Sequence, residues 1–129
     1  KLEYFNSETL VNRNKCAYYY SEKLKDISEL SLPVIREHNY SAWAQYSLVV
    51  KDKELRDNVV SYMKENGVNL AIFYPSPLHY QNCFQGKSRT MNLDVTEKIC
   101  DTIFNLPCYG EITTEEQDKI IDLLINYFK

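Results

Sequence analysis

The side chains best suited to chemistry gather in one short stretch, FYPSPLHYQNCF at residues 73–84. It combines two prolines with four aromatic rings, two amides, a histidine and a cysteine. Turns usually favour small polar residues, so this many rings in a proline-rich loop needs a reason. Tyr74, His79 and Gln81 offer hydrogen bonds, and rings beside prolines preorganise a pocket because few torsions freeze on binding. Packing of the same rings on helices explains the composition equally well.

A thiol nucleophile is a remote alternative for this loop. Cys83 lies four residues after His79, and a thiol hydrolase needs such a pair. Its cysteine, however, normally begins a helix that lowers the thiol pKa. The four cysteines contain no Cys-x-x-Cys pair and there are only two histidines, so no metal site is predicted, and we expect reduced, mostly buried thiols. Lys87 and Arg89 follow the loop as phosphate contacts or, more simply, as solvated charges.

Length and composition restrict the function further. The 129 residues, 44% of them apolar, predict one domain with a real core. A net charge of −3 gives no basic face for nucleic acid. No run of 18 apolar residues predicts a membrane span and no signal-peptide pattern opens the chain, so we expect a cytoplasmic protein. Because the chain starts at Lys1 rather than Met, it is expected to be a piece of a longer protein.

The first elements are predicted from apolar spacing and from end signals. A helix over roughly 5–28 carries apolar residues three, four and seven apart. Residues 43–50 read as a strand because they are aromatic and β-branched toward their end. A short strand near 34–40 is an open option. A second helix over 53–66 lies between a capping Asp52 and Gly67.

A second strand over 68–74, closed by Pro75, leads into the loop. After the loop, Asp94 and Glu97 resemble a capping box, and the helix they begin is expected to run until Leu106-Pro107. Thr113 and Glu116 form a cleaner capping box for the last helix, whose apolar face is Ile120, Leu123, Leu124 and Tyr127. The order of elements predicts an α+β fold, a small layer in which helices cover a short sheet.

Six landmarks, in register, resemble those of the DegT/StrS-type aminotransferases. Residues 73–81 resemble the family's H-Y-P-x-P-L-H-x-Q stretch. Residues 13–24 are similar to its R-x-x-x-A-x-x-Y-x-x-x-L helix, and 42–46 to the W-A-Q-Y strand entry of members that aminate 3-keto sugar nucleotides. The other three are the strand at 70–74, the T-E and L-P pairs at 96–97 and 106–107, and T-E-E-Q at 114–117.

The resemblance implies that residues 1–129 are the C-terminal small domain of a fold-type-I enzyme, with a short, mainly antiparallel sheet. The family uses pyridoxal 5′-phosphate, held by a large domain that would precede Lys1 and supply the Schiff-base lysine, so no lysine here is assigned a catalytic role. The implied enzyme is a homodimer that moves an amino group, commonly from glutamate, to a keto sugar nucleotide for amino-sugar and polysaccharide biosynthesis. The isolated domain is expected to be inactive.

The resemblance also carries four substrate-binding residues onto the loop: Phe73, Tyr74, His79 and Gln81. Phe73 stands where many members have histidine, which removes one hydrogen-bonding group. Two other functions stay open. One is a dehydratase relative with the same cofactor, and the other is a non-catalytic ligand-binding or interaction module that kept the fold.

Overall fold

Two short antiparallel strands form the centre of the molecule. In this computed structural model, which describes residues 8–84, 86 and 92–129, strand β1 (Tyr46–Val49) pairs with β2 (Ile103–Leu106). A single bridge continues the layer on each side, Ser31 to Val49 and Ala71 to Asn105. The strands meet across more than fifty residues of sequence, so the sheet joins the two halves of the chain.

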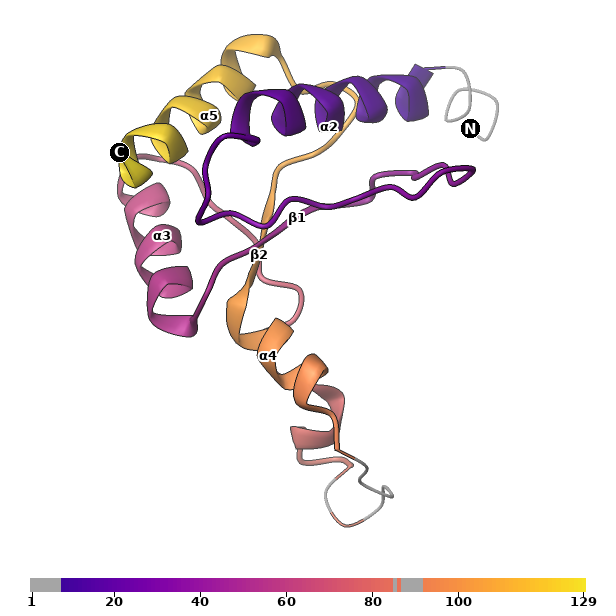
Figure 1. Ribbon diagram of the computed structural model, residues 1–129, viewed down its shortest axis with the longest axis vertical. Helices are drawn as coiled ribbons and strands as arrows, with labels where there is room; N and C mark the ends of the chain where they lie inside the picture. The colour runs from indigo at the N-terminus through magenta and orange to yellow at the C-terminus, as the bar shows by residue number, and fades with distance from the viewer. Residues whose placement is uncertain (1–7, 85, 87–91) are drawn as a thin grey trace.

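The described residues form four α-helices: α2 (Leu10–Leu24), α3 (Lys53–Glu65), α4 (Asp94–Thr102) and α5 (Thr114–Phe128). Figure 1 shows α2 and α5 side by side over one end of the strands, with α3 beside α5. Helix α4 and the loop at residues 73–84 extend away from this body. The predicted α+β fold, a small antiparallel sheet covered by helices, is confirmed. None of the helices in the described part of the chain is long and apolar enough to cross a bilayer.

The core lies between the strands and helices α2, α3 and α5. Helix α2 buries the face that its spacing predicts, which ends in Tyr20 and Leu24. The rings of Tyr20 and Tyr46 lie 5.2 Å apart. Both are fully buried and keep their hydroxyls satisfied, since Tyr20 donates to the Pro107 carbonyl at 3.0 Å and the hydroxyls of Tyr46 and Ser21 are 2.8 Å apart.

The end signals of two helices act as predicted. The Asp52 carboxylate accepts the backbone N–H of Leu55 at 2.8 Å, and Thr113 with Glu116 forms a complete capping box. At the C-terminal end of α3, Gly67 has a φ of +80°. The N–H groups of Gly67 and Val68 bond back to the carbonyls of Lys64 and Met63, which is a Schellman motif.

Four segments differ from the sequence-based expectations. Residues 34–40 contain no strand, and the predicted strand 68–74 is reduced to the one bridge at Ala71. The strand predicted over 43–50 is only Tyr46–Val49, because Trp43 has a φ of +44° and cannot extend it. Helix α2 ends at Leu24 rather than near 28, and residues 5–7 of its predicted start lie outside the described part of the chain.

The helix predicted up to Leu106 ends at Thr102, and β2 takes its last four residues. The apolar residues Ile103, Phe104 and Leu106 would fit a helix face or a buried strand equally well. Their pairing with β1 shows that they form a strand. Asp94 does not cap α4. The N-cap residue is Leu93, which makes no side-chain cap bond.

Candidate functional site

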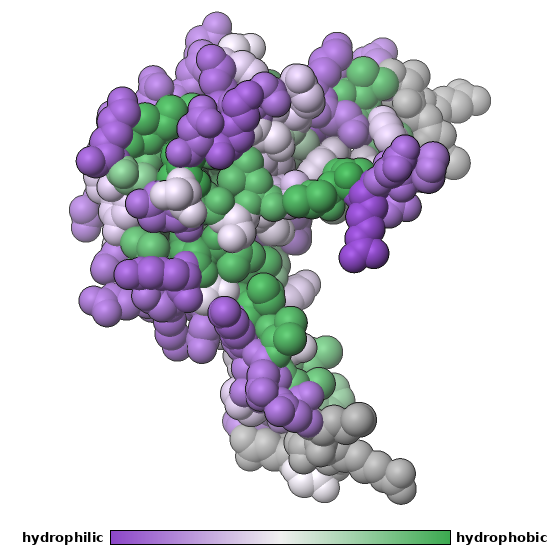
Figure 2. Space-filling model, viewed as in Figure 1, coloured by the Kyte–Doolittle hydropathy of each residue, from purple (hydrophilic) through white to green (hydrophobic). Residues whose placement is uncertain are grey.

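Helix α4 and residues 73–84 form a projection that we call the arm. Figure 1 shows it extending away from the body of the molecule. On the face seen in Figure 2, hydrophobic residues continue from the body along one side of the arm. Exposed large apolar residues are concentrated here and at Leu93, which precedes α4: Phe73, Tyr74, Leu78, Tyr80, Phe84, Leu93, Val95 and Ile99. An apolar surface of this kind marks a binding or contact site.

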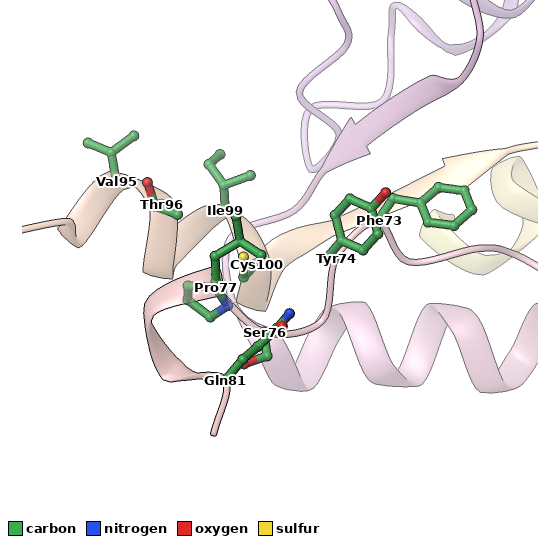
Figure 3. Close-up of a pocket in the computed structure, with 10 residues that line it drawn as sticks. Phe73, Tyr74, Ser76, Pro77, Gln81, Val95, Thr96, Ile99 and Cys100 are labelled. Atoms are coloured by element: carbon green, nitrogen blue, oxygen red, sulfur yellow. The ribbon is translucent and has the colours of Figure 1, made fainter. Parts of the chain in front are cut away.

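A cavity of about 710 Å³ opens on the arm between its two segments. Figure 3 shows the rings of Phe73 and Tyr74 near the C-terminal end of α4, with Ser76 and Gln81 further along the loop. The loop lines the cavity with Phe73, Tyr74, Ser76, Pro77, Leu78 and Gln81, and α4 with Val95, Thr96, Ile99 and Cys100. The volume suits a small organic ligand.

The polar side chains that line the cavity carry no formal charge. The Tyr74, Ser76 and Thr96 hydroxyls and the Gln81 amide can donate and accept hydrogen bonds. The rings of Phe73 and Tyr74 lie 5.6 Å apart and are tilted by 59°. Rings with a few hydrogen-bonding groups around them suit a flat or ring-shaped polar ligand, such as a sugar or a base. Three of the four predicted site residues, Phe73, Tyr74 and Gln81, therefore line one cavity.

His79, the fourth predicted residue, faces a different way. Its Nε2 lies 3.0 Å from the Glu97 Oε1 on α4, and its ring edge packs on Tyr80 with centroids 4.4 Å apart. It lines a smaller cavity of about 370 Å³, with Phe84 and Leu93. Interaction with the same Glu97 carboxylate raises the pKa of Tyr80.

The thiols do not form a second site. Cys83 is exposed and Cys100 half-buried, whereas Cys16 and Cys108 are buried, so the expectation of mostly buried thiols holds only for part of the set. Contact with Cys108 and burial raise the pKa of Cys16. Among the residues whose placement is described, no cluster of three His, Cys, Asp or Glu could hold a metal ion.

The described lysines do not fit a Schiff-base role. None of them lines the 710 Å³ cavity. All nine are exposed: Lys15, Lys23, Lys25, Lys51, Lys53, Lys64, Lys98, Lys119 and Lys129. A catalytic imine needs a lysine held against the cofactor ring. Lys1 and Lys87, with Arg89, lie outside the described residues.

Arg56 positions the arm and could not be singled out from the sequence. Its guanidinium is buried, with Nη1 donating to the carbonyls of Cys100 at 3.2 Å and Ile103 at 3.4 Å. Its Nε donates to the Asp57 carboxylate at 2.6 Å. A cation at the last carbonyls of a helix also favours the helix dipole. The signal available in advance is only that Arg56 shares a helix face with Val59 and Met63 (i, i+3, i+7).

The comparisons with known proteins agree with the sequence landmarks. Residues 1–125 match the DegT/DnrJ/EryC1/StrS aminotransferase family. This chain belongs to that family. The UDP-2-acetamido-2-deoxy-3-oxo-D-glucuronate aminotransferase of Pseudomonas aeruginosa is 30% identical over 126 residues, which are 98% of this chain and 33% of that protein. The dTDP-3-amino-3,4,6-trideoxy-alpha-D-glucose transaminase of Micromonospora megalomicea is 29% identical over 88% of this chain and 31% of that protein. The chain thus spans about a third of these DegT-family relatives.

Solved structures show the same partial match. A DegT/DnrJ/EryC1/StrS aminotransferase from Brucella abortus has a TM-score of 0.87 and 30% identity over 98% of this chain and 33% of its own. NtdA from Bacillus subtilis, solved with bound PMP, has a TM-score of 0.81 and 25% identity over 93% of this chain and 28% of its own. The fold of this chain is therefore that of one portion of these larger proteins.

Proposed function

We propose that this chain is the C-terminal domain of a pyridoxal-phosphate aminotransferase that moves an amino group from glutamate to a keto sugar nucleotide. The observation that carries the proposal is the cavity on the arm, lined by the loop that resembles the family's H-Y-P-x-P-L-H-x-Q motif. The names of the relatives support the substrate class, since several act on UDP- or dTDP-linked 3-oxo or 3-amino sugars. A Bacillus subtilis relative, a 3-oxo-glucose-6-phosphate:glutamate aminotransferase, supports glutamate as donor.

In this proposal the chain supplies one wall of the substrate site. The Tyr74 hydroxyl and the Gln81 amide bind hydroxyl or carbonyl groups of the substrate, while the Phe73 ring packs on its flat face. Phe73 contributes contact area and no hydrogen bond. Binding groups of this kind lower the energy of the bound substrate and orient it, so their loss is felt mainly in KM.

The cofactor belongs to the remaining two-thirds of the protein. None of the described lysines fits the role of the Schiff-base lysine, so no step is assigned to the residues of this chain through the cofactor. The PMP bound in NtdA supports the use of this cofactor by the family. We infer that the whole enzyme is a cytoplasmic homodimer of amino-sugar biosynthesis.

A non-catalytic module is the second candidate, and the names of two relatives favour it. A pleiotropic regulatory protein of Geobacillus stearothermophilus and a sensory transduction protein of Saccharopolyspora erythraea match this chain at 25% and 27% identity. A regulatory protein would bind the sugar nucleotide on the same arm without converting it. A dehydratase relative would convert it without consuming glutamate.

The deciding experiment uses the full-length protein with pyridoxal phosphate, glutamate and a UDP- or dTDP-linked 3-keto sugar. The expected result is stoichiometric formation of 2-oxoglutarate and amino sugar. Sugar consumption without 2-oxoglutarate would indicate the dehydratase, and binding without turnover the module.

Tyr74→Phe tests the proposed wall in the same assay. Loss of one hydrogen bond is expected to raise the sugar KM roughly five- to tenfold with a small change in kcat. Tyr18→Phe, which removes the hydroxyl of an exposed tyrosine on α2, is the matched control and should leave KM unchanged. If Tyr74→Phe chiefly lowers the free energy of unfolding, the ring has a packing role instead.

A further inference from the structure

The two walls of the cavity come from separate segments, so its shape depends on how they are held together. One wall is the loop 73–81, and the other is one face of α4, beginning at Val95. The loop contains only a single 3₁₀ turn, Leu78–Tyr80. Such a turn has poor hydrogen-bond geometry and little stability of its own. Something outside the turn must therefore fix the loop against α4.

Glu97 lies where this connection is needed. Its carboxylate faces the loop from the middle of α4, 3.0 Å from the His79 Nε2. The side chains of His79 and Glu97 are 13% and 37% exposed, so the pair is partly shielded from water. The Tyr80 ring packs against the His79 ring, with centroids 4.4 Å apart, so the contact with Glu97 also bears on the next loop residue.

Helix α4, which carries Glu97, is itself held in place at its C-terminal end. Arg56 ties the C-terminal end of α4 to α3 through the Cys100 and Ile103 carbonyls, and β2 continues directly from that end. On the loop side, Pro77 is buried and Gln81, a lining residue, follows the 3₁₀ turn directly. A restraint on His79 therefore reaches Gln81 within two residues.

We propose that Glu97 is a positioning residue that sets the substrate wall by holding His79, and the Tyr80 ring packed on it, against α4. His79 then acts through Glu97 and not by contact with the ligand in the larger cavity. The inference rests on the proposed function for its effect on catalysis. The physical restraint on the loop is measurable without any activity.

Hydrogen exchange in the full-length protein tests the restraint directly. The backbone N–H groups of Tyr80, Gln81 and Phe84 bond to the Pro77, Leu78 and Gln81 carbonyls and report on the turn. We expect them to exchange roughly three- to tenfold faster in Glu97→Gln, which keeps the shape and removes the charge, and at least as fast in Glu97→Ala. Glu115→Gln, an exposed first-turn glutamate of α5, is the control and should exchange as wild type.

Two further variants show whether Glu97 acts through His79. If it does, the His79→Ala/Glu97→Gln double variant exchanges little faster than the faster single variant, because both remove one interaction. Additive effects would overturn this part of the inference. Unchanged exchange in both Glu97 variants would overturn all of it.

Kinetics separate this inference from the proposed function. With turnover, Glu97→Gln should raise the sugar KM roughly threefold or more and leave kcat close to wild type, and Glu97→Asp should restore part of the affinity. Turnover with an unchanged KM would show that Glu97 does not set the wall. Absence of turnover in the wild type would refute the proposed function, while the exchange rates would still decide the positioning role.

Discussion

Fully buried tyrosines show how single residues stabilise this domain. Tyr20 and Tyr46 place large rings in the core and keep their hydroxyls hydrogen-bonded to Pro107 and Ser21. Removal from water raises the pKa of both phenols above the ordinary value of 10.0. The folded state therefore keeps these protons at a pH where the unfolded chain loses them.

This difference predicts alkaline instability. Because the folded pKa of Tyr20 is raised, its contribution is fully present below about pH 10 and is lost as the pH rises further, at about 1.4 kcal/mol per pH unit. Tyr20→Phe should be about 1 kcal/mol less stable than wild type near neutral pH. The gap should close or reverse by about pH 11. Urea unfolding of the chain across this range measures it.

The matched control is Tyr18→Phe, on the exposed side of α2. Its stability should stay at a constant distance from wild type over the same pH range. A Tyr20→Phe gap that widens with pH would contradict the assignment of the buried proton.

The sequence predicted a pocket at residues 73–84 but could not reveal which of the loop's side chains face it. Phe73, Tyr74 and Gln81 line the cavity, whereas His79 bonds to Glu97, eighteen residues further along. Spacing cannot show this division, because a loop without periodicity gives no direction for its side chains. The role of Arg56 could not be predicted for a related reason, since its carbonyl partners near Cys100 are remote in sequence.

At the scale of elements, the end signals at Asp52, Gly67 and Thr113 were predictable, whereas the start of α4 and strand β2 were not. Asp52, Gly67 and Thr113 act locally, within one turn of their helices, so their residue types suffice. Strand β2 has four residues, of which Phe104, Asn105 and Leu106 are buried, and so shows no alternation. Only the partner β1 defines it, and that partner is a tertiary contact.

Gly67 offers a test of an end signal. At a φ of +80° a Cβ is strained, so Gly67→Ala should lower the free energy of unfolding by about 1–2 kcal/mol. The position has room, because a Cβ there would lie 3.5 Å from the Lys119 Nζ, at the end of a flexible side chain. Gly67→Asn should cost less, since asparagine tolerates this conformation better. Equal losses in the two variants would indicate crowding in place of backbone strain.

For the molecule as a whole, the proposed function gives the chain a substrate wall, and none of its described lysines fits a covalent role. Incubation of the chain with pyridoxal phosphate and reduction with borohydride should therefore give no stoichiometric label on one lysine. Peptide mapping by mass spectrometry checks this, with the full-length protein as positive control. A single, fully labelled lysine in the chain would contradict the proposal that the cofactor is bound outside this chain.

The single bridges beside the strands have a consequence for self-association. Ser31 exchanges two backbone hydrogen bonds with the outer edge of β1, and Ala71 does so with the outer edge of β2. In strands of four residues, one such bridge on each side occupies the position where a foreign strand would begin to pair. The two residues thus act as blocking groups that protect the sheet against fibre-like growth, although neither belongs to a regular strand.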